Sequence, residues 1–296
     1  MRVCSTGFDS KPHGLAVGDF NNDGRLDIAV TNNGNANIGF FFCLGDGIFS
    51  KQSTVSLING TFPVAVEVGD FDNDNLLDIV VSKYYDNDIS VLLGYGNGSF
   101  ADQMTFSTGL TPYCVAIGDF NNDNQTDIVT ANWGSNDVSV LLGYGDGTFA
   151  DEMRYPTGSS PYSVTVGDFN NDTILDIVVA NHGNDNVGIF LGWGNGSFSS
   201  QETFTTGFES EPNAVTVGDF NNDTLLDIIV VNYGTSNVGV LLGYGNGSFA
   251  NVKIFSIGYG SLPFALAVGD LNNDGKLDFA VANEGTDNVQ IFLQTC

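Results

Sequence analysis

The sequence predicts an all-β protein, a six-bladed β-propeller of four-stranded antiparallel blades, and three observations support this prediction. A Gly-Asp-Phe tripeptide (Gly-Asp-Leu in the last copy) recurs every 49 to 51 residues, with its aspartates at Asp19, Asp70, Asp119, Asp168, Asp219 and Asp270. Each repeat holds four short apolar runs and shows no helical periodicity. Glycine accounts for 38 of the 296 residues, which is typical of a chain with many tight turns. Repeats of this length and pattern indicate one propeller domain over residues 1–296.

The fourth repeat shows how the four strands are expected to follow one another. The first strand is predicted at 163–166, before the recurrent aspartate, and the second at 176–180, after an acidic loop. The third is predicted at 187–191 and the fourth at 200–205, after the turn Gly-Trp-Gly-Asn-Gly-Ser-Phe. Asn and Gly stand at every junction, as hairpin turns require. A β-helix is the structural alternative, but its repeats are much shorter.

The two ends of the chain predict how the propeller closes. Residues 1–8 (MRVCSTGF) match the fourth strand of a repeat, for example 202–208 (ETFTTGF). The last repeat stops after a third strand at 289–293. We therefore expect residues 1–8 to complete the last blade as its outer strand, which removes an exposed sheet edge.

Composition excludes several function classes. The formal net charge is −27, which argues against binding nucleic acid or docking on an anionic membrane. No apolar run approaches the length of a membrane span, and residues 1–11 lack the apolar stretch of a signal peptide. The cysteines at 4, 43, 114 and 296 form no metal-binding pair, and free thiols are expected.

An acidic loop between the first and second strands carries the predicted chemistry. Oxygen-bearing side chains recur at loop positions 1, 3, 5 and 9, and three or four carboxylates within nine residues repel one another unless a cation binds. Position 7 holds unrelated side chains, which fits a backbone carbonyl ligand. The predicted metal ligands in loop order are Asp19, Asn21, Asp23, Arg25, Asp27; Asp70, Asp72, Asp74, Leu76, Asp78; Asp119, Asn121, Asp123, Gln125, Asp127; Asp168, Asn170, Asp172, Ile174, Asp176; Asp219, Asn221, Asp223, Leu225, Asp227; and Asp270, Asn272, Asp274, Lys276, Asp278.

Calcium is the expected ion, with about six sites, one in each repeat. Ca²⁺ accepts six to eight oxygen ligands in flexible geometry, whereas Mg²⁺ prefers few carboxylates and several waters. The alternative is a set of Asx-turns without metal, but the same oxygen spacing in six copies favours calcium. Loop position 6 is Gly24, Asn75, Asn124, Thr173, Thr224 or Gly275, and we expect a left-handed backbone there, by comparison with the EF-hand loop.

The unit VGDFNNDxxxDIVVANxGxxNVxVLLGYGNGSF resembles the VCBS-type, or FG-GAP-like, repeat and is more distantly similar to the blades of the integrin α-subunit head. The resemblance covers essentially the whole chain. It implies a calcium-binding propeller, usually extracellular, with calcium in the strand 1–2 loop and ligands bound on the opposite face. This chain differs from many relatives in having six repeats rather than seven, and Asn at loop position 3 in five of them.

Residues that vary between repeats are the candidates for ligand binding. One set follows the second strand and reads Asn33, Tyr84, Trp133, His182, Tyr233 and Glu284. The other follows a recurrent proline and reads His13, Val64, Tyr113, Tyr162, Asn213 and Phe264. Aromatic rings beside amides suit a glycan or a protein ligand. The candidate ligand-binding residues are Tyr84, Trp133, His182, Tyr233, Tyr113 and Tyr162, with ordinary rim packing as the alternative.

Two further features belong to the turns. The aromatic residue of the Leu-Gly-Tyr-Gly segment is regular, at Tyr95, Tyr144, Trp193 and Tyr244, and regularity favours packing between blades. Seven Asn-x-Ser/Thr sequons occur, at Asn59, Asn97, Asn124, Asn171, Asn195, Asn222 and Asn246, and they give weak support for a secreted glycoprotein.

Three functions remain open from the sequence. The first is a calcium-binding extracellular or cell-surface module for adhesion or recognition, most simply a monomer. The second is a propeller-type polysaccharide lyase or hydrolase, for which Glu209 and Glu211 are a possible acid and base. Only two histidines are present, His13 and His182, and most acidic residues belong to the loops, so an enzyme is the less favoured alternative. The third is a purely structural repeat domain.

Overall fold

The computed structural model describes residues 4–58 and 61–294. The chain forms two compact units. The first comprises Met1–Asp119, Asp123–Ser135 and Ser139–Arg154, and the second comprises Phe120–Asn122, Asn136–Val138 and Tyr155–Cys296. Among the described residues, no helix is long and apolar enough to cross a membrane.

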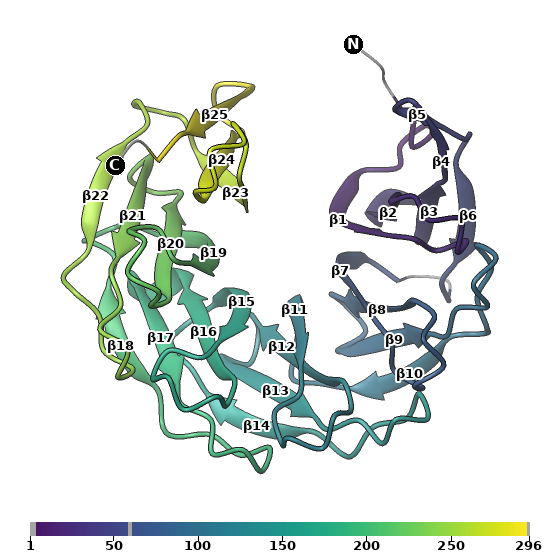
Figure 1. The fold of residues 1–296 in the computed structure, drawn as a ribbon, viewed down its shortest axis with the longest axis horizontal. Coiled ribbons are helices and arrows are strands. Elements are labelled where there is room, and N and C mark those ends of the chain that lie inside the picture. The colour runs from purple at the N-terminus through teal and green to yellow at the C-terminus, as the bar shows by residue number, and fades with distance from the viewer. Residues whose placement is uncertain (1–3, 59–60, 295–296) are drawn as a thin grey trace. The chain divides into compact units, whose positions relative to one another are not determined.

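The first unit contains three four-stranded antiparallel sheets (Figure 1). Their strands are, sheet by sheet, β1 (Pro12–Gly18), β2 (Asp27–Asn32), β3 (Asn37–Phe41) and β6 (Ser53–Ser56); β7 (Pro63–Gly69), β8 (Asp78–Lys83), β9 (Asp88–Leu92) and β10 (Met104–Ser107); β11 (Pro112–Gly118), β12 (Asp127–Asn132), β13 (Asp137–Leu141) and β14 (Met153–Pro156). A small hairpin of β4 (Cys43–Gly45) and β5 (Ile48–Phe49) follows β3.

The second unit repeats the same plan (Figure 1). Its sheets are β15 (Pro161–Gly167), β16 (Asp176–Asn181), β17 (Asn186–Phe190) and β18 (Glu202–Thr205); β19 (Pro212–Gly218), β20 (Asp227–Asn232), β21 (Asn237–Leu241) and β22 (Lys253–Ser256); and β23 (Pro263–Gly269), β24 (Asp278–Asn283) and β25 (Asn288–Phe292). Single 3-10 turns at Asn33–Asn35 and His182–Asn184 follow β2 and β16. The predicted all-β fold of six propeller blades is confirmed, with strand boundaries within two residues of those expected in the fourth repeat.

Each blade packs its apolar residues against the next blade of the same unit. Because β8, β12, β16 and β20 are covered on both faces, every residue in them is buried. Between the second and third blades, Val91 and Phe71 pack in one cluster with Val115, Ile128 and Phe149. Equivalent clusters join the first blade to the second and the fourth to the fifth. These layers hold the loops at the strand ends in a fixed position.

A backbone hydrogen bond also joins consecutive blades. The carbonyl of Phe71, in the acidic loop of the second blade, accepts a hydrogen bond of 2.9 Å from the N–H of Gly147 in the turn of the third blade. The same bond joins Phe20 to Gly98, Phe120 to Gly196 and Phe169 to Gly247. We call this the Phe–Gly joint.

The predicted closing strand is not seen among the described residues. Residues 1–3 lie outside them, residues 4–8 form no strand, and the sheet of β23, β24 and β25 has three strands there. Closure by residues 1–8 therefore stays a prediction. No disulfide joins Cys4, Cys43 and Cys114 to one another, and Cys296 lies outside the described residues, so the expected free thiols stay a prediction.

Candidate metal centre and ligand surface

The six acidic loops connect the first strand of each blade to the second, as predicted. The aspartate at loop position 9 is the first residue of the second strand and is fully buried in every blade, at Asp27, Asp78, Asp127, Asp176, Asp227 and Asp278. In the second blade, Asp78 Oδ2 accepts a hydrogen bond of 2.8 Å from the N–H of Phe71, and Oδ1 accepts one of 2.7 Å from the N–H of Gly94. A buried carboxylate needs such donors, so this aspartate ties loop to strand whether or not a metal binds.

The side chains at loop positions 1, 3 and 5 point into the loop, where they accept hydrogen bonds from its backbone N–H groups. Asp70 Oδ1 and Oδ2 accept the N–H groups of Asp74 and Asn75 at 3.2 and 2.9 Å. Asp72 Oδ1 also accepts the N–H of Asp74, and Asp74 Oδ1 accepts that of Leu76. The first, fourth, fifth and sixth loops repeat this pattern. Carboxylate oxygens are thereby gathered on the inside of each loop.

Two left-handed residues give the loop its shape. Position 6 has positive φ in all six copies, as predicted, from 63° at Asn75 and Asn124 to 82° at Gly275. Thr173 and Thr224 adopt it with φ of 70° and 69°, although a β-branched residue resists this conformation. The sequence analysis missed position 4, which is always Asn and has φ between 58° and 61° in all six loops. The signal was present, because Asn is the residue other than Gly that best tolerates this conformation.

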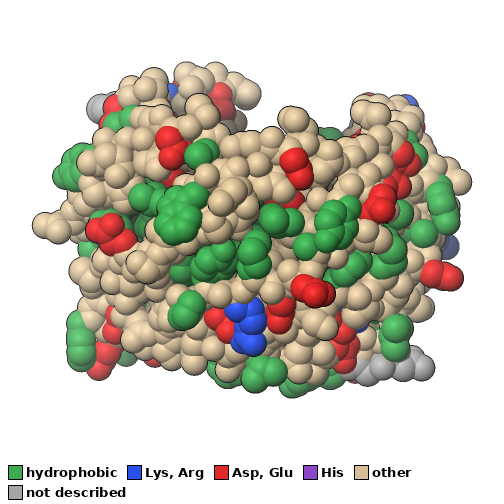
Figure 2. Space-filling view, turned by 90° about the horizontal axis from the view of Figure 1, so that it is seen from below, with side chains coloured by type: hydrophobic (Ala, Val, Ile, Leu, Met, Phe, Trp, Pro, Cys, Tyr) green, Lys and Arg blue, Asp and Glu red, His purple; other side chains and the backbone are tan. Residues whose placement is uncertain are grey.

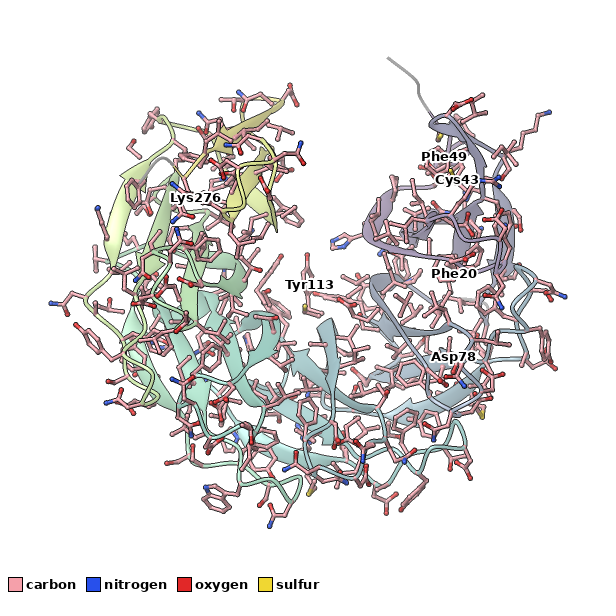
Figure 3. The ribbon with its side chains drawn as sticks, in the orientation of Figure 1. Phe20, Cys43, Phe49, Asp78, Tyr113 and Lys276 are labelled. Carbon is pink, nitrogen blue, oxygen red and sulfur yellow. The ribbon has the colours of Figure 1, made fainter. Side chains whose placement is uncertain are left out.

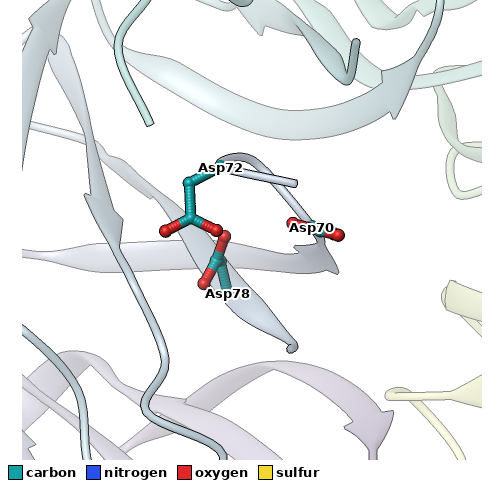
Figure 4. Close-up of side chains that lie close together, drawn as sticks. All are labelled: Asp70, Asp72 and Asp78. Carbon is teal, nitrogen blue, oxygen red and sulfur yellow. The ribbon is translucent and has the colours of Figure 1, made fainter. Parts of the chain in front are cut away.

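The carboxylates come closest together in the second loop. One oxygen each from Asp70, Asp72 and Asp78 lies within 4.8 Å of the other two, and Figure 4 shows the carboxylates of Asp72 and Asp78 adjacent to each other. Burial raises the pKa of Asp78 to about 6, and burial followed by the negative charge of Asp74 raises the pKa of Asp72. Burial also raises the pKa of Asp176 to about 6. A raised pKa means that the surroundings disfavour the ionised carboxylate, and a bound cation would favour it.

This donor set fits calcium. It offers only oxygen atoms from carboxylates, an amide and the predicted carbonyl, which are the hard ligands that Ca²⁺ takes. In the first loop, the guanidinium of Arg25 at position 7 lies 3.1 Å from Asp23 Oδ2 and supplies a positive charge there itself. The predicted position-7 residues all lie in the loops, and the carbonyl role of Arg25, Leu76, Gln125, Ile174, Leu225 and Lys276 stays a prediction.

Candidate ligand residues of the first unit meet at the opposite ends of the strands. The ring centroid of Tyr84, just after β8, lies 6.3 Å from that of Trp133 and 6.0 Å from that of Tyr113. Figure 3 labels Tyr113, whose side chain projects from β11. His13 Nε2 lies 3.2 Å from the hydroxyl of Tyr113. Phe62 and Tyr85 extend the group, with their ring centroids 4.6 Å apart. We call His13, Phe62, Tyr84, Tyr85, Tyr113 and Trp133 the aromatic cluster.

Sequence reasoning missed Phe62 and Tyr85 in this cluster. Tyr85 stands where the other five blades have glycine, and that exception was a usable signal. The rings remain available, since Tyr85 is 63 %, Phe62 38 % and Trp133 37 % exposed. Beneath Tyr84, the buried Lys83 Nζ lies 2.8 Å from Asp88 Oδ1, where the fourth blade has an Asn181–Asn186 amide pair. The second blade therefore departs from the repeat on this surface.

The remaining ligand candidates lie in the second unit. The rings of Tyr162 and His182 are 5.0 Å apart, so the structure brings this predicted pair together. Tyr233 makes no ring contact among the described aromatic residues, and its N–H donates to the carbonyl of Glu211. The N–H groups of Glu209 and Glu211 both donate hydrogen bonds to the carboxylate of Asp185. Asp185 therefore fixes the backbone of the turn that carries this possible acid–base pair.

One expectation is wrong. Tyr95, Tyr144, Trp193 and Tyr244 do not pack between blades, because they are 60 %, 64 %, 62 % and 61 % exposed. The backbone explains this result, since the tight turn directs the ring outward while the phenylalanine five residues later enters the core, as Phe149, Phe198 and Phe249 do. Figure 2 shows acidic side chains scattered over the visible face, in keeping with the strong negative charge.

The comparisons with known proteins agree with this geometry. The model of the FG-GAP-like repeat matches residues 19–81, 71–130, 119–179, 168–230 and 219–281, so the chain belongs to the FG-GAP-like repeat family. No curated protein matches the sequence.

Solved structures share the fold. Virginiamycin B lyase from Staphylococcus aureus is similar with a TM-score of 0.68 and 15% identity, over 99% of this chain and 88% of that one. A lectin from Agrocybe aegerita that recognises non-reducing terminal N-acetylglucosamine is similar with a TM-score of 0.62 and 18% identity, over 95% of this chain and 80% of the lectin. At such identities the likeness establishes the β-propeller fold alone.

Proposed function

We propose that this protein is a calcium-stabilised extracellular recognition module that binds a glycan or a protein ligand. The observation that carries the proposal is the repeated loop geometry, in which carboxylates are held inward by backbone hydrogen bonds and Asp70, Asp72 and Asp78 converge. Calcium would neutralise charges that otherwise repel one another, and each loop would then fix the start of one blade.

Metal counting tests the calcium part of the proposal. After dialysis against calcium and removal of free ion, we expect about six Ca²⁺ per chain, and none or one would refute the proposal. Sites of extracellular modules bind at roughly 0.1–1 mM, so about 1 mM calcium should add on the order of 0.4–1.4 kcal/mol per site. Chelation should therefore lower the melting temperature by many degrees.

The aromatic cluster supports the recognition part. The exposed aromatic rings of the cluster offer a flat apolar surface with polar groups at its edges. Such a surface suits stacking against a sugar ring or contact with an apolar side chain of a protein partner. The cluster lies at the end of β8, while the acidic loop precedes its start, so calcium and ligand would occupy opposite ends of one blade. The resemblance to a lectin fold is consistent with a glycan ligand.

Binding to glycan and protein arrays tests the ligand. Tyr84→Ala and Trp133→Ala should abolish any specific signal, whereas Tyr259→Ala, which removes a fully exposed ring elsewhere, should keep it. A purely structural repeat would give no specific signal with any of the three variants or with the unaltered protein.

A further inference from the structure

The turns that carry the exposed aromatic residues also carry three of the sequons. Asn97, Asn195 and Asn246 each lie two residues after Tyr95, Trp193 or Tyr244 and two before a serine. All three asparagines are exposed. The third blade has the same turn with Asp146 in place of asparagine, so it lacks the sequon.

Each turn presents its asparagine in one fixed arrangement. Asn97 Oδ1 accepts hydrogen bonds from the N–H and the hydroxyl of Ser99 at 2.9 and 2.5 Å, while the N–H of Tyr95 donates to the carbonyl of Ser99 at 3.0 Å. Asn195 and Asn246 bind Ser197 and Ser248 in the same way. Among the described residues, the Nδ2 of these three asparagines makes no hydrogen bond. The side-chain nitrogen to which a glycan would be attached therefore lies on an exposed residue and takes part in no hydrogen bond among the described residues.

The described sequons of the acidic loops differ from the turn sequons. Asn171 packs its Nδ2 against the turn of the next blade, 2.8 Å from where a Cβ on Gly245 would lie. At Asn171 and Asn222, the threonine of the sequon gives its N–H to a loop aspartate, Asp168 or Asp219, rather than to the asparagine. A glycan at these asparagines, or at Asn124, would also stand among the proposed calcium ligands.

The exposed rings are the second observation. Tyr95, Trp193 and Tyr244 are about equally exposed, and among the described residues none contacts another aromatic ring. Glycine flanks each ring on both sides, at positions 94 and 96 in the second blade, so the two residues adjacent in sequence place no side chain beside it. A flat exposed ring two residues before the asparagine can support the apolar face of the first sugar.

We propose that Asn97, Asn195 and Asn246 are sites of N-linked glycosylation, with the first N-acetylhexosamine resting on the ring two residues earlier. This inference rests on the proposed extracellular location. A transferase of the secretory pathway would join Nδ2 to C1 of a lipid-linked oligosaccharide, breaking the bond from C1 to the pyrophosphate oxygen as the amide loses one proton. No oxidation or reduction is involved.

Site mapping tests the assignment. The full chain is expressed behind a secretion leader in a eukaryotic host, which supplies the transferase and the donor. Protein from cells and medium is treated with a glycosidase that converts each glycosylated Asn to Asp. The protein is then digested, and mass spectrometry of the peptides measures the fraction converted at each site. We expect occupancy at Asn97, Asn195 and Asn246 several-fold above that at Asn124, Asn171 and Asn222. Equal or lower occupancy at the turns overturns the proposal.

The third blade provides a matched gain of function. Asp146→Asn creates a fourth turn sequon with Thr148 behind Tyr144, and we expect it to be glycosylated, whereas an unmodified Asn at 146 would contradict the proposal. Asn97→Asp recreates the turn of the third blade, because an aspartate keeps the acceptor for Ser99. It should lose one glycan and leave the melting temperature of deglycosylated protein unchanged.

The role of the rings is tested separately. Trimming the glycans should lower the melting temperature of the unaltered protein but have little effect when Tyr95, Trp193 and Tyr244 are all replaced by Ala. An equal response in both proteins overturns the contact between sugar and ring. Calcium counting on deglycosylated protein tests the proposed calcium binding independently, so failure of one proposal does not hide the other.

Discussion

Asp78 and Gly94 are joined by a hydrogen bond of 2.7 Å from the N–H of Gly94 to Asp78 Oδ1, which ties the acidic loop to the turn after the third strand. The same bond links Asp127 to Gly143, Asp176 to Gly192 and Asp227 to Gly243. The aspartate at loop position 9 thus supports the fold as well as the proposed metal site.

Asp78→Ala should therefore destabilise the protein both with and without calcium. It leaves the N–H groups of Phe71 and Gly94 unpaired in a buried place, and we expect a loss of about 2–4 kcal/mol in the free energy of unfolding. Asp74→Ala is the matched control, because Asp74 is exposed and should affect stability mainly in the presence of calcium. Chemical denaturation with and without calcium measures both effects. Similar losses for the two variants in calcium-free buffer would contradict the structural role of Asp78.

Acid should act in opposite directions on the calcium-free and the calcium-loaded protein. The pKa of Asp78 and Asp176 is about 6 in the fold, above the ordinary aspartate value of 3.8, so the fold binds their protons more tightly than the unfolded chain does. These two groups should therefore stabilise the calcium-free fold as the pH falls through 6. With calcium bound, protons compete with the ion, so calcium affinity and stability should fall over the same range. Calorimetry on dialysed and on calcium-saturated protein at pH 7 and 5 measures both slopes, and slopes of the same sign would refute this account.

Glu67 is an acidic residue inside a sheet at a position where the other blades have Ala or Thr. Burial raises its pKa to about 7, so the ionised carboxylate destabilises the fold above that pH. Glu67 destabilises the fold least below a pH of about 4.5, the ordinary pKa of a glutamate, and its contribution to stability declines as the pH rises toward 7. We expect Glu67→Ala to raise the free energy of unfolding at pH 8 by about 1–3 kcal/mol and to have little effect at pH 4.5. A gain that is equal at both values of pH would assign the effect to packing instead.

The fourth and fifth loops should bind calcium more weakly than the first and sixth. Thr173 and Thr224 have φ of 70° and 69°, where threonine is strained by about 1 kcal/mol relative to glycine. Thr173→Gly and Thr224→Gly should each tighten calcium binding about fivefold, as that energy implies. Gly24→Thr in the first loop is the reciprocal variant and should weaken its site. Unchanged affinities in all three variants would show that position 6 does not limit binding.

The fold was predictable because repetition supplied the same information six times. The tripeptide at Asp19 and its five copies indicated the number of blades, and the loop spacing located the proposed metal ligands in the loop between the first and second strands and at the first residue of the second strand. Closure by residues 1–8 rested on a short match of eight residues, and no described contact tests it.

The ligand surface was predictable only in part. Variation between repeats identified Tyr84, Tyr113 and Trp133, which do meet. Contacts such as Phe62 with Tyr85 depend on side-chain directions after irregular connections, which sequence spacing does not give. The regularity of Tyr95 and Trp193 was misleading, since a repeated turn can point the same residue outward as consistently as a repeated strand points one inward.

The Phe–Gly joint has a consequence for how such a protein can grow. Each joint uses only main-chain atoms, and a blade that has both the acidic loop and the glycine-rich turn contains the acceptor for the following blade and the donor for the preceding one. A duplicated blade therefore brings the donor and the acceptor of this bond with it, and the bond itself needs no compensating substitution in the neighbouring blades. Gene duplication can lengthen the array while each new side chain on the surface is free to diverge.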